Sequence, residues 1–183
     1  MSIHDEILAR LETSLQNLMM DDLTLDDETR AGVVIQGPTQ GEPEPDTARI
    51  SITLHENDPD GFYGKAGAST LSSGWEDEIV EVECGGSVTW RRRFTVKAFC
   101  LFIDTGEDLP TARRIASTVR SRLEQAVLQT SFEGVCSGDE FVSKGPIAEG
   151  VQAEMVQAGG PPDSYGYHIK VRFEIETTIG VTP

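Results

Sequence analysis

The segment YHIKVRFEIE, residues 167–176, alternates between apolar and polar side chains without interruption. Its odd-numbered residues are Tyr, Ile, Val, Phe and Ile, and its even-numbered residues are His, Lys, Arg, Glu and Glu. Because successive side chains of a strand point to opposite faces, this pattern predicts a strand with one buried and one solvent-exposed face. The strand follows a helix and a second long strand, and this order favours a structural part over a catalyst.

The second long strand is predicted for residues 91–103. One of its faces carries apolar side chains, which are Phe94, Val96, Ala98, Cys100 and Phe102. The other face becomes apolar toward the end of the strand, which indicates that the second half is covered on both sides. Cys100 is interpreted as a core residue, because a small hydrophobic side chain suits that face.

Two amphipathic helices are predicted, at about residues 3–20 and 110–129. In the first, apolar residues recur at spacings of three and four, and Ser2 is placed to cap the helix. The second begins with Pro110, which suits a first helical turn, and its apolar stripe excludes most of its four arginines. Each helix therefore has one apolar face with which to cover other elements.

Shorter strands are predicted at residues 33–35, 50–54, 79–83 and 147–157. The third of them ends at Gly85-Gly86, a pair that favours a tight hairpin turn into Val88. The chain has 183 residues and no internal repeat, so we expect a single domain over residues 1–183.

A long excursion is predicted at about residues 56–74, where glycines are frequent and apolar residues are scattered. Loops of this length in a compact domain are usually functional or disordered. Phe62, Tyr63 and Trp75, in or beside this segment, are candidate partner-contact residues.

Charge and cysteine content narrow the class of protein. Asp and Glu number 31 against 15 Lys and Arg, and the formal net charge of -16 opposes binding to nucleic acid, which depends on basic side chains. The three cysteines form no disulfide framework or zinc-site spacing, which indicates a reducing, cytosolic setting. The N-terminal residues lack the basic character of a signal peptide and no long apolar run follows, so we expect no membrane association.

Candidate catalytic residues are sparse. His4, His55 and His168 are scattered over a helix, a loop mouth and a strand, and we expect structural or surface roles for them. Residues 57–61, NDPDG, bring carboxylates around a glycine but lack the ligand spacing of an EF-hand, so a turn is favoured. No phosphate-binding loop, nucleophile elbow or zinc-protease motif is present. We therefore expect no catalytic residue, no metal and no cofactor.

Arginines supply the candidate interface residues. Arg91, Arg92 and Arg93 form the only dense basic run, directly after Trp90. Arginine forms bidentate contacts with carboxylates, so this run could bind acidic patches of a neighbouring copy; the alternative is a solvated strand end. Arg113 and Arg120 of the second helix admit the same two interpretations.

The order of these elements resembles that of the tail terminator proteins of long-tailed bacteriophages. The resemblance rests on the N-terminal helix at residues 3–20, a strand near Ile50, the long strand at 91–103 followed at once by the helix at 110–129, and the closing strand at 168–176. It covers most of the chain, but it is a pattern of elements and not a sequence motif. The length of the chain and its excursion at 56–74 depart from the family.

The resemblance implies an α+β subunit in which the N-terminal helix and the second long helix pack on a mostly antiparallel sheet. It also implies a homo-oligomer, a six-membered ring in the virion that caps the tail tube, meets a neck or head-completion protein, and is assembled in the host cytoplasm. An acidic channel would let DNA pass without specific binding.

The sequence is also compatible with two other functions. One is a neck or head-completion adaptor of a tailed phage, and the other is a small metal-dependent hydrolase built around His55, Asp58 and Asp60.

Overall fold

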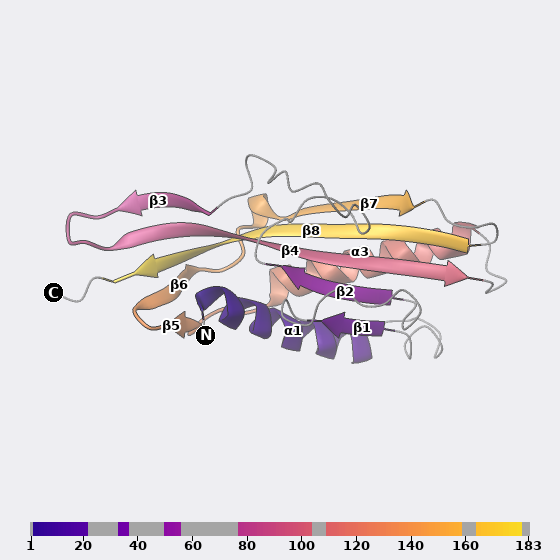
Figure 1. The fold of residues 1–183 in the computed structure, drawn as a ribbon, viewed down its shortest axis with the longest axis horizontal. Helices are drawn as coiled ribbons and strands as arrows, with labels where there is room; N and C mark the ends of the chain where they lie inside the picture. Colours follow the sequence, from indigo (N-terminus) through magenta and orange to yellow (C-terminus); the bar gives the residue numbers. More distant parts are fainter. Residues whose placement is uncertain are drawn as a thin grey trace, which may run out of the picture.

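The computed structural model describes residues 2–21, 33–36, 50–55, 77–103, 109–158 and 164–180. It confirms the α+β fold with a mostly antiparallel sheet and two long helices (Figure 1). The helices are α1 (Ile3–Asp21) and α3 (Leu109–Gln129), with a short 3-10 helix η1 (Ala148–Gly150). The strands are β1 (Val33–Gln36), β2 (Ile50–His55), β3 (Glu78–Val82), β4 (Val88–Ile103), β5 (Cys136–Ser137), β6 (Glu140–Lys144), β7 (Gln152–Ala158) and β8 (Ser164–Ile179).

The described strands form one sheet in the order β1-β2-β4-β8-β6-β5. Strand β3 also pairs with β4, and β7 also pairs with β8. Every pairing is antiparallel except that between β1 and β2. Strands β4 and β8 pair with each other at the centre of the sheet. The outer edge of β4 pairs with β2 and β3, and the outer edge of β8 pairs with β6 and β7. Strands β3 and β7 therefore lie at opposite edges of the sheet.

The central pair of strands is longer than the sequence predicted. Strands β4 and β8 have 16 residues each and pair from Val88 opposite Ile179 to Ile103 opposite Ser164. Beyond the strictly alternating segment of β8, the β-branched residues Thr177 and Thr178 continue the strand, as their propensity allows. The two strands therefore run the length of the molecule (Figure 1).

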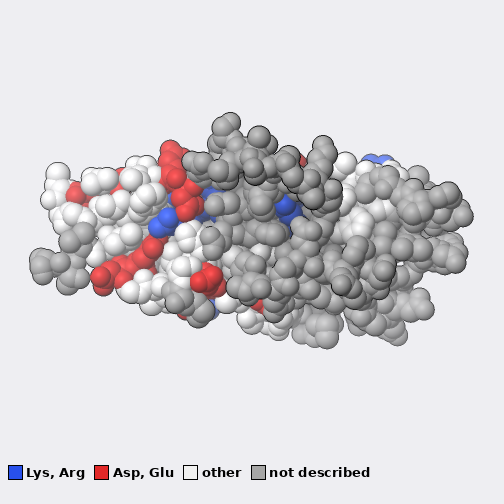
Figure 2. Space-filling model, in the orientation of Figure 1, with Lys and Arg blue, Asp and Glu red and all other residues white. Residues whose placement is uncertain are grey.

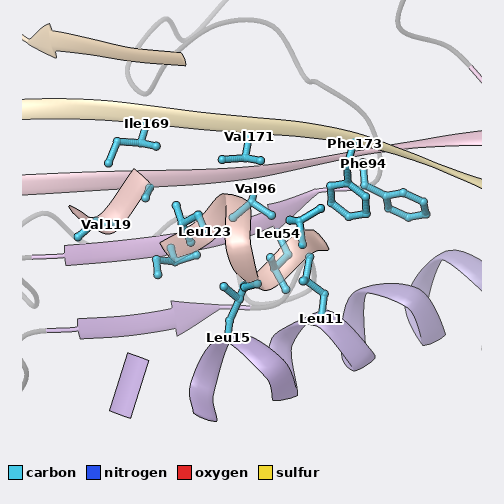
Figure 3. Packing of buried hydrophobic residues seen from close by; sticks show 14 of the residues in the cluster. Leu11, Leu15, Leu54, Phe94, Val96, Val119, Leu123, Ile169, Val171 and Phe173 are labelled. Carbon is cyan, nitrogen blue, oxygen red and sulfur yellow. The ribbon is translucent and has the colours of Figure 1, made fainter. Parts of the chain in front are cut away.

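Both long helices pack on one face of this sheet, as their apolar stripes predicted. Figure 3 shows Leu11 and Leu15 of α1, and Val119 and Leu123 of α3, directed toward Val96 of β4. All five side chains are fully buried. At one end of the cluster the stacked rings of Phe94 and Phe173 lie 5.2 Å apart between centroids. The core predicted from periodicity is confirmed for the described side chains, including a fully buried Cys100, whereas the side chain of Phe102 is not among those described.

The second face of the sheet is not uniformly exposed, which corrects the expectation for residues 167–176. Lys97 of β4 lies directly opposite Lys170 of β8, and these residues are only 7% and 4% exposed. Beside them, Phe99 and His168 stack with ring centroids 4.7 Å apart. Strands β2 and β7 flank this central pair. Alternation alone does not show that these two lysines are buried.

Two further details differ from the sequence prediction. The strand expected at residues 147–157 begins later, at Gln152, because residues 148–150 form η1. The backbone of η1 passes close to the side chain of Glu174 in β8, since a Cβ at Gly150 would lie 3.1 Å from Oε2 of Glu174. The β5–β6 hairpin was not predicted, although Gly138, with φ of 61°, is the kind of residue that its turn requires.

Candidate functional site

The arginine run lies in β4 close to the start of α1, because the ring of His4 in α1 contacts Phe94, the residue that follows the run. Strand alternation places Arg92 on the same face as Phe94, toward the helices, and Arg91 and Arg93 on the opposite face. The side chain of Arg91 is 31% exposed, whereas those of Arg92 and Arg93 are each 13% exposed. Adjacent positions in the sequence thus serve two separate networks.

Arg92 joins three segments of the chain. Its Nη1 donates to Oδ2 of Asp77 at 2.9 Å and its Nη2 donates to Oε1 of Glu140 at 2.8 Å. The hydroxyl of Thr177 on β8 also donates to the same Glu140 oxygen. The guanidinium carbon of Arg92 lies 4.7 Å from the centroid of the Trp90 ring, a cation–π distance. One cation therefore ties β4 to β6 and to the residue that precedes β3.

Asp77 is the acceptor at the centre of this network. Besides Arg92, the His4 ring of α1 lies 3.0 Å from it through Nε2, and the backbone N–H of Arg93 donates to it at 3.1 Å. Burial by itself would raise the pKa of Asp77, but these hydrogen bonds outweigh burial and hold its pKa below the ordinary value of 3.8. The ionised carboxylate thus fastens the start of α1 to the sheet.

The other two arginines bind acidic residues of β3 and β8. Arg93 donates from Nε to Glu174 at 3.0 Å and from Nη2 to Glu78 at 3.1 Å. Arg91 makes longer contacts, 3.6 Å to Glu174 and 3.5 Å to Glu176. The run is therefore not a solvated strand end, because its guanidinium groups make ion pairs within the chain. That these arginines also meet a neighbouring copy stays a prediction.

A second basic surface forms a groove between α3 and β7, with a volume of about 1020 Å³. Its helix wall carries three arginines and three hydroxyl groups, those of Arg113, Arg114, Arg122, Ser117, Thr118 and Ser121. Its sheet floor includes Met155 and Tyr167. Arg113 and Arg114 are exposed, and Arg122 donates to Gln125 at 3.2 Å. Of the described residues that line the groove, none is acidic, so the groove suits carboxylate or phosphate groups.

Only one of the two helix arginines predicted at an interface lines this groove. Arg113 is part of its wall, whereas Arg120 pairs with Glu124 one turn along the same helix, at 3.8 Å. The sequence signal for the groove was present in the polar positions outside the apolar stripe of α3. The floor was not foreseeable, because Met155 and Tyr167 come from strands whose position depends on sheet order.

The β3–β4 hairpin is a third surface, and it is apolar and acidic. Ile79, Val80 and Val82 are 50%, 43% and 66% exposed, although they lie in a strand. Along its other edge β3 has no strand partner among the described residues. In Figure 1 the hairpin extends beyond both helices, and Figure 2 shows acidic side chains among uncharged ones at this end of the molecule. An exposed apolar edge of this kind is normally covered by another chain or blunted by charge.

The hairpin turn was predicted correctly from the glycine pair. Gly86 has φ of 91°, a left-handed conformation that side chains disfavour, and its N–H donates to the carbonyl of Glu83 at 3.0 Å. Cys84, beside it, is exposed. The turn therefore presents a thiol at the far end of the hairpin.

Several predicted residues lie outside the described residues. These are Phe62, Tyr63, Trp75, Asp58, Asp60 and the whole excursion at 56–74. His55 ends β2, but its side chain is not among those described. Within the described ranges, no three His, Cys, Asp or Glu side chains are grouped to hold a metal ion. In the same ranges, neither long helix is apolar enough to cross a membrane.

No family model matches this chain, and a search of curated proteins found no match either.

Proposed function

We propose that this protein is a structural subunit that forms a closed ring at the end of a phage tail tube and presents a docking surface to the neck. The observation that carries the proposal is the β3–β4 hairpin, which extends past the helix-covered core with three apolar side chains at least 43% exposed. A monomer gains nothing from this exposure, whereas a ring of subunits covers it. The order of elements resembles that of tail terminators, and from this resemblance we infer that the ring sits at the end of a tail tube.

The sheet supports assembly through its edges. At one edge β3 is exposed along its whole length, and at the opposite edge β7 lies beside the arginine-lined groove. Surfaces that differ at two edges favour head-to-tail contacts, which close into rings when the rotation per subunit allows. The size of the ring, six members, is what the resemblance to tail terminators implies.

The acidic composition suits a channel through which DNA passes. Of the described carboxylates, Asp77, Glu140 and Glu174 are engaged by arginines of β4, while Glu133 and Asp139, outside the β3–β4 hairpin, are exposed. A lining of like charge repels phosphates and so prevents DNA from adhering. The proposal places the protein in the virion, assembled in the host cytoplasm, with the tail tube protein and a neck protein as partners and with no catalytic role.

A tube-capping experiment tests the proposal. Tail tube protein from the same phage is allowed to polymerise with and without this protein, and tube lengths are measured by electron microscopy. We expect added protein to stop elongation and to leave a ring of density at one tube end. If tubes elongate unchanged while the protein binds head–neck complexes, it is instead the neck adaptor. If it binds neither, the virion assignment is wrong.

A further inference from the structure

We propose that the β3–β4 hairpin of one copy inserts into the α3–β7 groove of the next copy, head to tail. This inference rests on the proposed ring and deepens it by assigning the two surfaces that meet. It commits to a second copy of this chain as the occupant of the groove. The two surfaces match in shape and in charge, and they lie at opposite edges of the sheet.

The groove has two unlike sides. Its floor includes the apolar side chain of Met155 and the ring of Tyr167, and its wall is the polar stripe of α3 with Arg113 and Arg114 exposed. A volume of about 1020 Å³ lies at the upper end of the size of ligand pockets and is large for a small ion. The groove therefore fits a segment with one apolar side and one acidic side.

The hairpin is such a segment. In its register with β4, Ile79 and Val82 lie opposite Trp90 and Val88, while Glu81 lies opposite Thr89 on the other face. Ile79 and Val82 are three positions apart, so strict alternation would place them on opposite faces. A bulge at Val80 adds one residue to the strand and brings both side chains to the same face. Inserted in the groove, the hairpin would set its apolar face on the sheet floor and its carboxylates against the arginines.

The two surfaces cannot meet within one chain. The hairpin pairs with the first residues of β4, at one edge and one end of the sheet. The groove adjoins β7 and Tyr167, at the opposite edge and toward the other end of β8. Each copy thus carries one acidic projection and one basic recess far apart, and a repeated contact between them adds subunits in one direction.

Reversing the charges of the hairpin or of the groove tests the contact between them. Mixing the two variants then tests whether the contact runs from the hairpin of one copy to the groove of the next. One variant carries Glu81→Lys and Glu83→Lys in the hairpin, and the other carries Arg113→Glu and Arg114→Glu in the groove. All four positions are exposed, so we expect both variants to fold with unchanged circular dichroism and urea midpoints. In each variant alone, the hairpin and the groove carry charges of the same sign and repel each other. We therefore expect the ring to be lost and the mass to fall to the 19.9 kDa of the protomer.

An equimolar mixture should restore the ring. The hairpin of the groove variant remains acidic and meets the basic groove of the hairpin variant, and the reverse contact pairs a basic hairpin with an acidic groove. Subunits then alternate, which permits rings with an even number of members only. A chain that carries all four substitutions should form rings by itself. As a control, Glu133→Lys, exposed between α3 and β5, should leave assembly of the wild type unaffected.

The outcomes separate this inference from the proposed function. Rings that persist in either reversed variant, or a mixture that stays monomeric although each variant is folded, overturn the hairpin-in-groove contact and leave the ring proposal standing. A wild-type chain that forms no ring under any condition, including with tail tubes, overturns both. If the mixture of the two variants forms dimers and no larger species, the contact is two-fold, and the head-to-tail arrangement is contradicted.

The exposed thiol of Cys84 gives a second measurement. With Cys136→Ser to remove the other exposed thiol, Ser121→Cys places a partner in the groove wall. Mild oxidation should link copies covalently into a ladder that ends at the ring size. The matched variant Glu133→Cys in the same background should give no ladder, and equal linking of the two variants would contradict the proposal.

Discussion

Arg91, Arg92 and Arg93 are chemically identical, yet strand alternation gives them different surroundings. Arg92 lies on the helix side with two carboxylates within 2.9 Å and the Trp90 ring beside it, whereas the contacts of Arg91 are 3.5 Å or longer. The sequence alone shows that these three arginines form a basic run in an acidic chain. The partners could not be predicted, because they come from three other elements.

Replacing Arg92 should destabilise the fold more than replacing Arg91. In Arg92→Met, Asp77 and Glu140 lose their shared cation in a largely enclosed position, so we expect the free energy of unfolding to fall by about 2–3 kcal/mol. Arg91→Met, the matched control, should cost less than about 1 kcal/mol, as partly exposed pairs do. Urea unfolding followed by circular dichroism measures both. Equal losses would contradict the network described here.

Asp77 should make stability fall in acid. Its folded pKa is lower than the ordinary 3.8, so near and below that value the unfolded chain binds more protons than the folded one. The contribution of Asp77 is therefore complete well above pH 3.8 and is lost as the pH falls through the folded pKa. Urea midpoints between about pH 6 and pH 3 should decline less steeply in Asp77→Asn than in the wild type. The exposed Asp139→Asn serves as control, and an identical decline in all three proteins would exclude this role.

The cysteines should differ sharply in reactivity. Complete burial raises the pKa of Cys100 to about 12, so it is not a thiolate at neutral pH, whereas Cys84 and Cys136 are exposed. We expect a disulfide reagent to label two thiols in the native monomer and the third only after unfolding. Rapid labelling of all three without denaturant would show that the core near Cys100 opens readily.

At the scale of elements, periodicity was a good guide wherever one face of an element is buried. The helices and the strand at 167–176 were predicted because their apolar residues repeat at helical or strand spacing and those faces do form the core. Prediction was poorer for η1 and the β5–β6 hairpin, which contribute little to the main core. Sheet order was not predictable from local pattern, since it depends on contacts between β4, β2, β8 and β3.

Hairpin β3–β4 should separate assembly from folding. Ile79→Thr with Val82→Thr keeps β-branched side chains in the strand but removes exposed apolar surface, so the free energy of unfolding should change by less than about 0.5 kcal/mol per site. Ring formation should weaken strongly, because the apolar face that a neighbour would cover is gone. Sedimentation velocity measures the change. The matched substitution Leu128→Thr, at an exposed residue of α3, should leave ring formation intact.

At the scale of the whole molecule, charge is distributed unevenly. The chain has a net charge of -16, yet α3 presents a groove with three arginines and no acidic lining residue among those described. The hairpin at the other edge of the sheet carries exposed glutamates. Net charge could be predicted from composition, but the separation of the two surfaces could not, because it follows from the order of strands.

This separation predicts a salt-sensitive assembly. At about 1 M salt the screening length falls to roughly 3 Å, which weakens contacts between exposed charges far more than the apolar core. We expect the subunit dissociation constant to rise by about tenfold or more between low and high salt, while the urea midpoint of the monomer changes little. Sedimentation at several salt concentrations measures this. Assembly that strengthens with salt would point to a purely apolar interface.

The proposed function requires that the protein closes into a ring, and its mass in solution shows whether it does. Light scattering across a wide concentration range, with negative-stain images of the same sample and with tail tubes added in a parallel sample, gives the mass and the symmetry together. We expect a closed ring with a central opening and a mass six times the 19.9 kDa of the protomer. A protein that stays monomeric at every concentration and leaves tube ends bare would contradict it.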